Sequence, residues 1–350
     1  MRGVIEINLK ILAENCEAMK RNLPQGVLLA AVVKADAYGH GAGEVVKTLN
    51  DKADYFVTAT VEEAEEVREL TKKPILCLAK IDEEEVTRCI LKRIETSVSS
   101  EEDLDLLARS SERLGVCASA HLCFDTGMNR MGIKDEKAAY KLINEVFSCK
   151  TVSIKGVYSH FFDCKNRVKT AEQFLLFRSF FDSVPKKTIR HIAATEGAEE
   201  KCYALDMVRP GIGLYGYGTR GVKPVMAFKS KVARVAKLKK GETVGYGGSF
   251  VANEDCFVAT VSAGYADGVP RAFTGGEVLI GGKRRRVVGN VCMDYCFALA
   301  DKAVKTGDEV VFIGSQVGET LTAEDMAHSS GTISYEILTG VKRLKKIYIR

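Results

Sequence analysis

The sequence predicts an α/β protein in which a (β/α)8 barrel of the TIM type precedes a mainly β C-terminal domain. Eight short apolar runs alternate with amphipathic stretches, and after about residue 220 Val- and Gly-rich alternation replaces this pattern. A barrel of this type takes about 250 residues, fewer than the 350 in the chain. We expect residues 1–8 to form a strand that joins the C-terminal domain, residues 9–220 to form the barrel and residues 221–350 to form the β domain.

The eight apolar runs have the length and composition of buried parallel strands. The expected strands are 26–35, 55–60, 74–79, 95–99, 117–125, 153–160, 188–194 and 207–215. Helical patterns lie between them, for example at 61–70, 101–114, 136–147 and 170–183. Ser100 supplies a capping hydroxyl, and acidic residues follow it where the helix dipole favours them. We therefore expect a helix after each strand.

The C-terminal region has the alternation of a β domain. Its expected strands are 229–238, 257–262, 277–280, 287–294 and 309–314, with one short helix near 323–328.

Composition excludes several classes of protein. The 51 Lys and Arg nearly balance the 46 Asp and Glu, so the chain lacks the basic surface that a nucleic-acid partner needs. The longest uncharged apolar stretch, 26–33, falls far short of the roughly 20 residues of a membrane helix. No secretory signal is readable, and eleven cysteines without a C-x-x-C pair indicate reduced thiols. We therefore expect a cytoplasmic protein without a membrane partner.

One lysine stands at the carboxyl end of the first expected barrel strand, the end where barrel enzymes have their active sites. Lys34 follows the apolar run A-V-V and precedes A-D-A-Y-G-H-G. Burial lowers the pKa of a lysine, and Schiff-base chemistry requires a neutral amine. Taken alone, Lys34 fits better as a lysine that extends from a strand end into solvent.

The run V-V-K-A-D-A-Y-G-H-G resembles the pyridoxal phosphate lysine motif of the alanine racemase family, and further matches follow in order. They are D-T-G-M-N-R-M-G at 125–132, G-V-Y-S-H-F at 156–161, V-R-P-G-I at 208–212, G-Y-A-D-G at 264–268, C-M-D at 292–294 and T-I-S-Y-E at 332–336. The resemblance implies a pyridoxal 5'-phosphate-dependent racemase that interconverts L- and D-alanine and supplies D-alanine for cell-wall peptidoglycan. The family's barrel and β domain agree with the strand count.

The resemblance also implies two bases, one for each face of the α-carbon. Lys34 holds the cofactor and, once freed, is one base. Tyr265 is the other, supplied by the second subunit of a homodimer. A phenol has a pKa near 10, which must fall by about three units to act near neutrality, roughly 4 kcal/mol. Similarity to the family places His160 beside Tyr265, with Arg209 behind it.

The same resemblance assigns the residues that bind the cofactor. Arg209 faces the pyridine nitrogen, where a guanidinium can only donate, so that nitrogen stays unprotonated. Gly211 and Ile212 form the phosphate loop, and Tyr38 and Tyr335 add hydroxyls.

The stretch 191–196 departs from the family's usual H-x-A-N-S-A. Thr195 keeps a hydroxyl at the serine position and is expected to bind the phosphate, whereas Ala194 replaces the asparagine. Nothing in the sequence explains Glu196.

The expected anchors for the carboxylate of a small amino-acid substrate are Arg130 and the backbone N–H of Met293. Asp294 is expected to orient them. The spacing of the five histidines does not fit a metal site, so we expect no metal.

Cys123 stands where many members of the family carry a lysine carbamate that holds the motif's arginine. A thiol cannot form the carbamate. A Cys123 thiolate, a bound chloride, or Asp125 with backbone groups remain as ways to orient Arg130, and we favour the chloride.

Several alternative functions share features with an alanine racemase, and sequence features distinguish them. A serine or broad-specificity racemase is the alternative, although Tyr335 favours alanine over serine. Tyr295 and Val269 change the entrance region. A fold-related amino-acid decarboxylase usually carries a C-E-S-x-D stretch, which the chain lacks. A non-enzymatic pyridoxal phosphate carrier would have no second domain, and a barrel that only binds or scaffolds would bind no cofactor.

Overall fold

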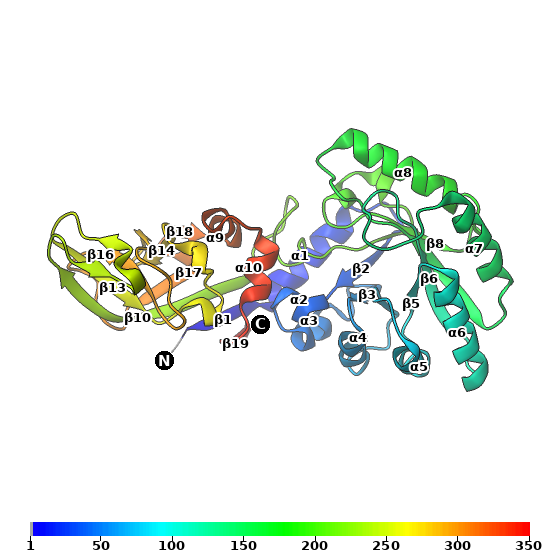
Figure 1. Ribbon diagram of the computed structural model, residues 1–350, viewed down its shortest axis with the longest axis horizontal. Helices are drawn as coiled ribbons and strands as arrows, with labels where there is room; N and C mark the ends of the chain where they lie inside the picture. Colours follow the sequence, from blue (N-terminus) through cyan, green and yellow to red (C-terminus); the bar gives the residue numbers. More distant parts are fainter. Residues whose placement is uncertain (1–2) are drawn as a thin grey trace. The chain divides into compact units, whose positions relative to one another are not determined.

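The computed structural model describes residues 3–350, which divide into two compact units (Figure 1). The barrel unit contains Leu12–Ala37 and Ala42–Val222. The β unit contains the segment up to Ile11, the short stretch Tyr38–Gly41, and Lys223–Arg350. The chain therefore passes from the barrel unit into the β unit shortly after Lys34, between Ala37 and Tyr38.

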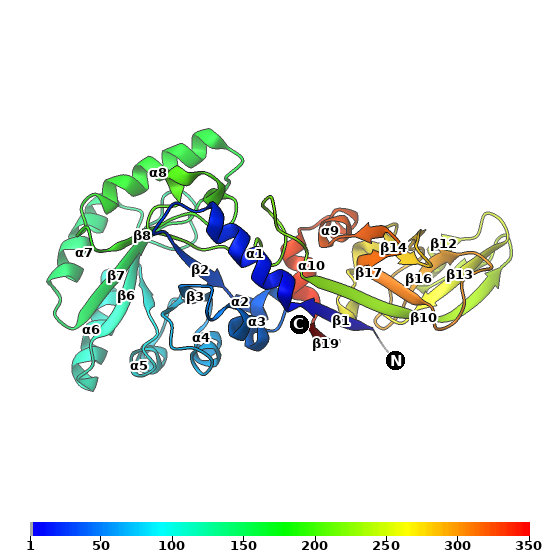
Figure 2. The ribbon, with the colours of Figure 1, turned by 180° about the vertical axis from the view of Figure 1, so that it is seen from behind.

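Eight strands form the wall of the barrel unit, as the sequence predicts, although each is shorter than expected. They are β2 (Leu28–Val32), β3 (Tyr55–Thr58), β4 (Ile75–Cys77), β5 (Thr96–Val98), β6 (Ala118–Cys123), β7 (Val152–Tyr158), β8 (Ile189–His191) and β9 (Met207–Val208). Neighbours pair in parallel, and β2 also pairs with β9. A bridge between Leu76 and Glu95 joins β4 to β5, and the N–H of Asp206 donates to Arg190 O at 3.1 Å to join β8 to β9. These contacts close the barrel. Figure 2 shows its strands and the helices around them from behind.

Helices cover the outside of this barrel. They are α3 (Ala42–Leu49), α4 (Val61–Arg68), α5 (Glu83–Leu91), α6 (Glu101–Leu114), α7 (Glu136–Ser148) and α8 (Arg167–Phe181). α6 has the predicted bounds, and Ser100 caps it by accepting the N–H of Asp103 at 3.2 Å. A one-turn helical segment, α2 (Lys34–Tyr38), follows β2 and is described with the site.

The prediction of a helix after every strand is wrong for the last two strands. Short 3-10 helices at Gly197–Glu199 and Lys201–Tyr203 follow β8, and turns rich in glycine follow β9. The helix α1 (Leu9–Asn22) precedes the first barrel strand and contacts the segment that follows β9. Asn15 Nδ2 on α1 donates to Leu214 O in that segment at 3.0 Å. Glycine is a poor helix former, so the chain after β9 forms turns and no helix.

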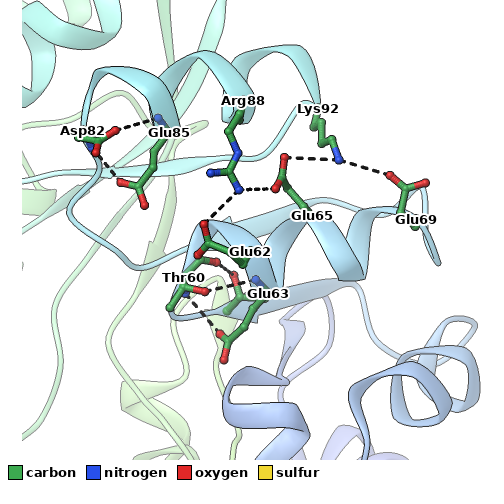
Figure 3. A network of polar contacts seen from close by, with 10 residues as sticks. Thr60, Glu62, Glu63, Glu65, Glu69, Asp82, Glu85, Arg88 and Lys92 are labelled. Atoms are coloured by element: carbon green, nitrogen blue, oxygen red, sulfur yellow. Dashed lines mark hydrogen bonds and ion pairs between the residues drawn. The ribbon is translucent and has the colours of Figure 1, made fainter.

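Ion pairs tie α4 to α5 (Figure 3). Arg88 on α5 contacts Glu65 and lies 3.1 Å from Glu62 on α4. Lys92 lies 3.4 Å from Glu65 and 3.5 Å from Glu69. Each helix also begins with a capping box, Thr60 with Glu63 and Asp82 with Glu85. Exposed ion pairs contribute only about 0–1 kcal/mol each, so this network adds little to the stability of the fold.

The β unit is built on one nine-stranded sheet. Its strands are β1 (Val4–Asn8), β10 (Met226–Leu238), β13 (Cys256–Val261), β14 (Glu277–Ile280), β15 (Lys283–Arg286), β16 (Cys296–Ala300), β17 (Glu309–Gln316), β18 (Glu319–Leu321) and β19 (Lys345–Ile349). β1 pairs antiparallel with β10 and parallel with β19. A separate hairpin joins β11 (Thr243–Val244) to β12 (Phe250–Val251). The helix expected near 323–328 is present as α9 (Ala323–Ser330), and α10 (Ser334–Gly340) follows.

The strand expected at 287–294 is wrong. Only Val287 makes a bridge, to Ala298, and Gly289 then turns the chain with a φ of +67°. The N–H of Cys292 donates to Tyr295 O at 2.8 Å and closes a tight turn. Val287, Val288 and Val291 are buried in a loop, and the strands β15 and β16 lie on either side of it in the sequence.

Each unit has its own apolar core. In the barrel unit Phe124 stacks on Phe180 with ring centroids 4.6 Å apart, and in the β unit Phe228 stacks on Phe312 at 4.7 Å. Within residues 3–350, no helix is long and apolar enough to cross a membrane.

Candidate active site

Lys34 lies at the start of a left-handed turn directly after β2. Residues 35–38 all have φ between 52° and 55°, although L-residues pay about 1–2 kcal/mol each for this conformation and rarely adopt it in succession. The N–H of Ala35 donates to Glu63 Oε1 at 2.6 Å. Glu63 also belongs to the capping box that begins α4 (Figure 3). Consecutive strained residues held by the surrounding structure are typical of functional sites.

The environment of Lys34 favours its neutral amine. Burial lowers the pKa of Lys34, and the positive charges of Arg130 and Arg209 lower it further, against the opposing effect of Glu63. A lysine of this kind reacts readily as a nucleophile or accepts a proton.

A cavity of about 180 Å³ lies beside Lys34 at the carboxyl ends of the barrel strands. Its polar lining includes Arg130, Tyr158, Ser159 and His160. Three residues singled out from the sequence, Lys34, Arg130 and His160, are thus gathered around one cavity.

Arg209 is 4% exposed and is held by acceptors from two neighbouring strand ends. Its Nη2 donates to Ser159 O at 2.7 Å, to Ile192 O at 3.3 Å and to His160 Nδ1 at 3.3 Å. Its Nη1 contacts His191 Nδ1. Burial lowers the pKa of Arg209 to about 10, so the guanidinium keeps its charge at neutral pH.

His160 is neutral. Burial lowers its pKa to about 3, and the charges of Arg209, Arg130 and Lys34 act in the same direction. Because Nδ1 accepts a hydrogen bond from Arg209, the proton of the neutral ring must be on Nε2. His160 therefore presents an N–H donor on its other side.

Thr195 organises the turn after β9. Its Oγ1 accepts the N–H of Gly211 at 3.2 Å and the N–H of Gly213 at 3.1 Å. The N–H of Gly211 is thus directed at Thr195, whereas the hydroxyl hydrogen of Thr195 is the donor left for a ligand. Ile212 O accepts the N–H of Tyr215 at 3.1 Å and closes the turn. The exposed Glu196 has no role that the structure explains.

Cys123 is a buried thiol. Burial raises its pKa to about 11, although a hydrogen bond with Tyr158 and the charges of Arg209 and Arg130 oppose the rise. The thiol is therefore neutral near pH 7, and the thiolate expected as one way to orient Arg130 is disfavoured.

Asp125 shapes the loop that carries Arg130. Its Oδ1 accepts the N–H of Gly127 at 2.9 Å and the N–H of Asn129 at 3.0 Å. Gly132 has a φ of +110°, and a Cβ on it would lie 2.6 Å from the backbone N of Asp125. The loop conformation therefore depends on the aspartate and the glycine of the motif.

The remaining predicted residues belong to the β unit. The N–H of Tyr265 donates to Cys292 O at 3.0 Å, which joins the G-Y-A-D-G turn to the C-M-D loop. A Cβ on Gly264 would lie 2.3 Å from Cys292 O, so only glycine permits this approach. Tyr265 is 44% exposed and Met293 is 53% exposed. Both side chains are thus presented on the surface of the β unit.

Arg343 fixes the same pair of loops, and sequence reasoning missed it. Its Nη2 lies 2.7 Å from Asp267 Oδ1 and 2.7 Å from Asp294 Oδ1. Asp267 Oδ2 in turn accepts the N–H of Gly264 at 3.0 Å. Asp294 therefore orients its loop through an ion pair, which no local pattern could reveal.

Tyr38 and Tyr335, both expected to bind the phosphate, also lie in the β unit. Their ring centroids are 5.9 Å apart with planes at 50°. Burial raises the pKa of Tyr38, so its hydroxyl stays protonated and can donate.

Among the described residues 3–350, no group of three or more His, Cys, Asp or Glu side chains is placed to hold a metal ion. The donors gathered in the barrel unit are instead an amine, a guanidinium and a hydroxyl.

Comparisons with known proteins agree with these motifs along nearly the whole chain. The family model "Alanine racemase, N-terminal domain" matches residues 7–219, and "Alanine racemase, C-terminal domain" matches residues 225–348. An alanine racemase of Thermodesulfovibrio yellowstonii is 37% identical over 356 residues, which cover 98% of this chain and 97% of the relative.

Solved structures are similar over the same length. The alanine racemase of the D-cycloserine producer Streptomyces lavendulae superposes with a TM-score of 0.95 at 30% identity, covering 100% of this chain and 97% of that one. A histidine racemase from Leuconostoc mesenteroides superposes with a TM-score of 0.90 at 26% identity, covering 99% and 98%. The chain belongs to the alanine racemase family.

Proposed function

We propose that this chain is a pyridoxal phosphate-dependent alanine racemase that interconverts L- and D-alanine and supplies D-alanine for peptidoglycan. The observation that carries the proposal is the cavity that gathers Lys34, Arg130 and His160, with Lys34 held by an unusual backbone turn and its amine biased toward the neutral form. Members of the alanine racemase family depend on pyridoxal phosphate.

The donors of the barrel unit fit this cofactor. The Lys34 amine suits its aldehyde, the Arg209 guanidinium suits its ring nitrogen, and the Thr195 hydroxyl with the turn at Gly211 and Ile212 suits its phosphate. Two of the three groups are buried, where charged and polar partners interact strongly. When bound, the cofactor supplies an electron-withdrawing ring that stabilises negative charge at the α-carbon.

Arg209 acts toward the ring nitrogen only as a donor. A guanidinium has five N–H groups, and the contacts described above engage both hydrogens of Nη2 and one of Nη1. Nε–H and the second hydrogen of Nη1 are therefore the donors left for the ring nitrogen. A donor at this position leaves the nitrogen unprotonated, which limits the stabilisation of a carbanion and so favours simple return of the proton.

Racemisation needs one base on each face of the α-carbon. We assign the first to Lys34 and the second to Tyr265 of the partner subunit in a homodimer. Three large side chains of the β unit are left exposed, Tyr265, Met293 and Tyr295 at 44%, 53% and 45%, which supports such an assembly. The neutral Nε2–H of His160 is suited to donate to a phenolate oxygen, which lowers the pKa of a tyrosine.

We assign the substrate carboxylate to Arg130 and the N–H of Met293, with Asp294 positioning the latter loop. A chloride beside Arg130, with the neutral Cys123 thiol as its wall, replaces the family's lysine carbamate. Tyr335 favours alanine over serine. The similarity to a histidine racemase makes a broader amino-acid range the second candidate. All eleven cysteines are free thiols, which fits activity in the reducing cytoplasm.

The test is chiral chromatography of L-alanine incubated with the purified, cofactor-loaded protein. We expect equal L- and D-alanine at equilibrium and a slower reaction with serine and histidine. Lys34→Ala should lack both racemisation and the visible absorbance of the covalently held cofactor. Release of carbon dioxide, or unchanged colour in Lys34→Ala, contradicts the proposal.

A further inference from the structure

A buried chain of polar side chains continues from Arg209 across the inside of the barrel unit. Nδ1 of His191 contacts Nη1 of Arg209, Nε2 of His191 lies 2.8 Å from Nδ1 of His121, and Nε2 of His121 lies 2.8 Å from Oε2 of Glu95. Both histidines are 0% exposed and Glu95 is 7% exposed. The chain thus joins a buried cation to a buried carboxylate through two imidazoles.

The hydrogen bonds in this chain have only one consistent direction. Arg209 can only donate, so Nδ1 of His191 must accept. Burial and the charge of Arg209 lower the pKa of His191 well below its usual value, so the ring is neutral and its proton is on Nε2. That N–H donates to Nδ1 of His121, whose own proton is then on Nε2 and points at Glu95. Every N–H is directed from Arg209 toward Glu95.

The surrounding strands leave room for this arrangement. Gly156 on β7 lies against His121, and a Cβ at that position would come within 2.3 Å of Nδ1 of His121. The ring of Tyr158 stacks on His191 with centroids 5.2 Å apart and planes at 9°. The glycine permits the contact between the histidines, and the tyrosine fixes the plane of His191.

We propose that Glu95 and His121 are positioning residues that act through His191 on Arg209. Arg209 fixes the direction of the N–H groups, and the carboxylate accepts the last of them and supplies the countercharge that a buried guanidinium needs. Arg209 is thereby held as a charged donor in one orientation. The effect of this chain on catalysis rests on the proposed function, whereas its hydrogen-bond direction does not.

Glu95→Gln is the decisive variant because it keeps the size of the side chain and removes its charge. Its amide oxygen can still accept the N–H of His121, so the variant removes the countercharge and keeps an acceptor. Glu95→Asp keeps the charge and serves as the conservative variant. Glu112→Gln, at an exposed position on α6, is the matched control.

The first measurement is 15N NMR of the histidine side chains in the full-length, cofactor-loaded protein, which has only five histidines. In the wild type we expect both His121 and His191 to be neutral with the proton on Nε2. Because Arg209 can only donate, Glu95→Gln and Glu112→Gln should both keep the proton of the two rings on Nε2. A proton on Nδ1 of either ring in the wild type overturns the proposal, whether or not the variants fold.

The second measurement follows the bound cofactor and the kinetics. Glu95→Gln should shift the absorbance maximum and lower kcat about tenfold with KM changed less than about twofold, and Glu95→Asp should recover most of the loss. A Glu95→Gln protein with wild-type absorbance and kcat overturns the proposal. If the tautomers are as expected but alanine is not racemised, the proposed function fails and the hydrogen-bond chain stands.

Discussion

Arg343 places Nε 2.8 Å and Nη2 2.7 Å from the same carboxylate oxygen of Asp267, a side chain that is fully buried. Since Nη2 also reaches Asp294, this guanidinium is the link between the turn of Tyr265 and the loop of Met293. The two residues expected to reach a substrate are thus held by one side chain from a distant part of the sequence.

Arg343→Ala should leave Asp267 buried without its cation and loosen both loops. We expect the midpoint of thermal unfolding to fall by several degrees and kcat/KM to fall at least about tenfold, because misplaced catalytic groups lose orientation. Differential scanning calorimetry and racemisation kinetics measure both effects. Arg284→Ala, which removes exposed ion pairs on a β hairpin, is the control and should change neither. An Arg343→Ala protein with wild-type kcat/KM would show that the two loops hold their places without it.

Removal of chloride should raise KM for alanine, because Arg130 would lose the anion that orients it. Cys123→Ala should keep much of its activity, since the thiol is neutral and forms only the wall of the site. Cys123→Lys should regain a carbamate and make activity respond to bicarbonate. Steady-state kinetics in chloride and in a non-coordinating salt provide the comparison. A thousandfold loss in Cys123→Ala, about 4 kcal/mol, would show instead that the sulfur itself is the replacement anion.

Acid should destabilise the protein through His160. Its pKa is about 3 in the folded chain and about 6.5 when unfolded, so between these values the unfolded state binds the extra proton. The free energy of unfolding therefore falls as pH drops from about 6.5 toward 3, by up to about 1.4 kcal/mol per pH unit for this group. Urea denaturation of His160→Gln between pH 4 and 7 should show a shallower fall than the wild type. His328→Gln, at an exposed position, should keep the wild-type slope; equal slopes in all three proteins would refute the buried neutral state of His160.

Lys34 and Tyr265 should complement each other between subunits. Lys34→Ala and Tyr265→Phe are each expected to be inactive. Statistical exchange in a mixture makes half the dimers mixed, and each mixed dimer has one intact site of two, so up to about a quarter of the wild-type activity should return. Native mass spectrometry verifies the exchange. Mixed dimers without any activity would rule out sites shared between subunits.

The sequence was most informative where periodicity or a motif is local. The barrel strands and the helix α6 follow from apolar spacing and a capping serine, and motif order alone singled out Lys34 and Arg209. The apolar composition of 287–294 led to a wrong strand prediction, because a buried loop and a strand can have the same composition. The positive φ of Gly289 turns the chain and makes this stretch a loop. β15 was not predicted either, because its four residues are all cationic and show no apolar alternation.

Contacts between distant residues could not be predicted. Glu95 and His121 are 26 residues apart and His121 and His191 are 70 apart, so only the closed barrel brings them together. The ion pair between Asp267 and Arg343 spans 76 residues. Such contacts depend on strand order and register, which periodicity does not encode.

Deuterium exchange in the Tyr265→Phe variant tests the two-base mechanism most directly. The variant keeps Lys34 on one face of the α-carbon and lacks a base on the other, so in deuterated water it should exchange the α-proton of one alanine enantiomer with retention of configuration. The other enantiomer should not exchange, and racemisation should fall at least about a thousandfold. NMR and chiral chromatography of the recovered alanine measure both. Equal exchange of the two enantiomers, or racemisation near the wild-type rate, would contradict the assignment of Lys34 and Tyr265 as the two bases.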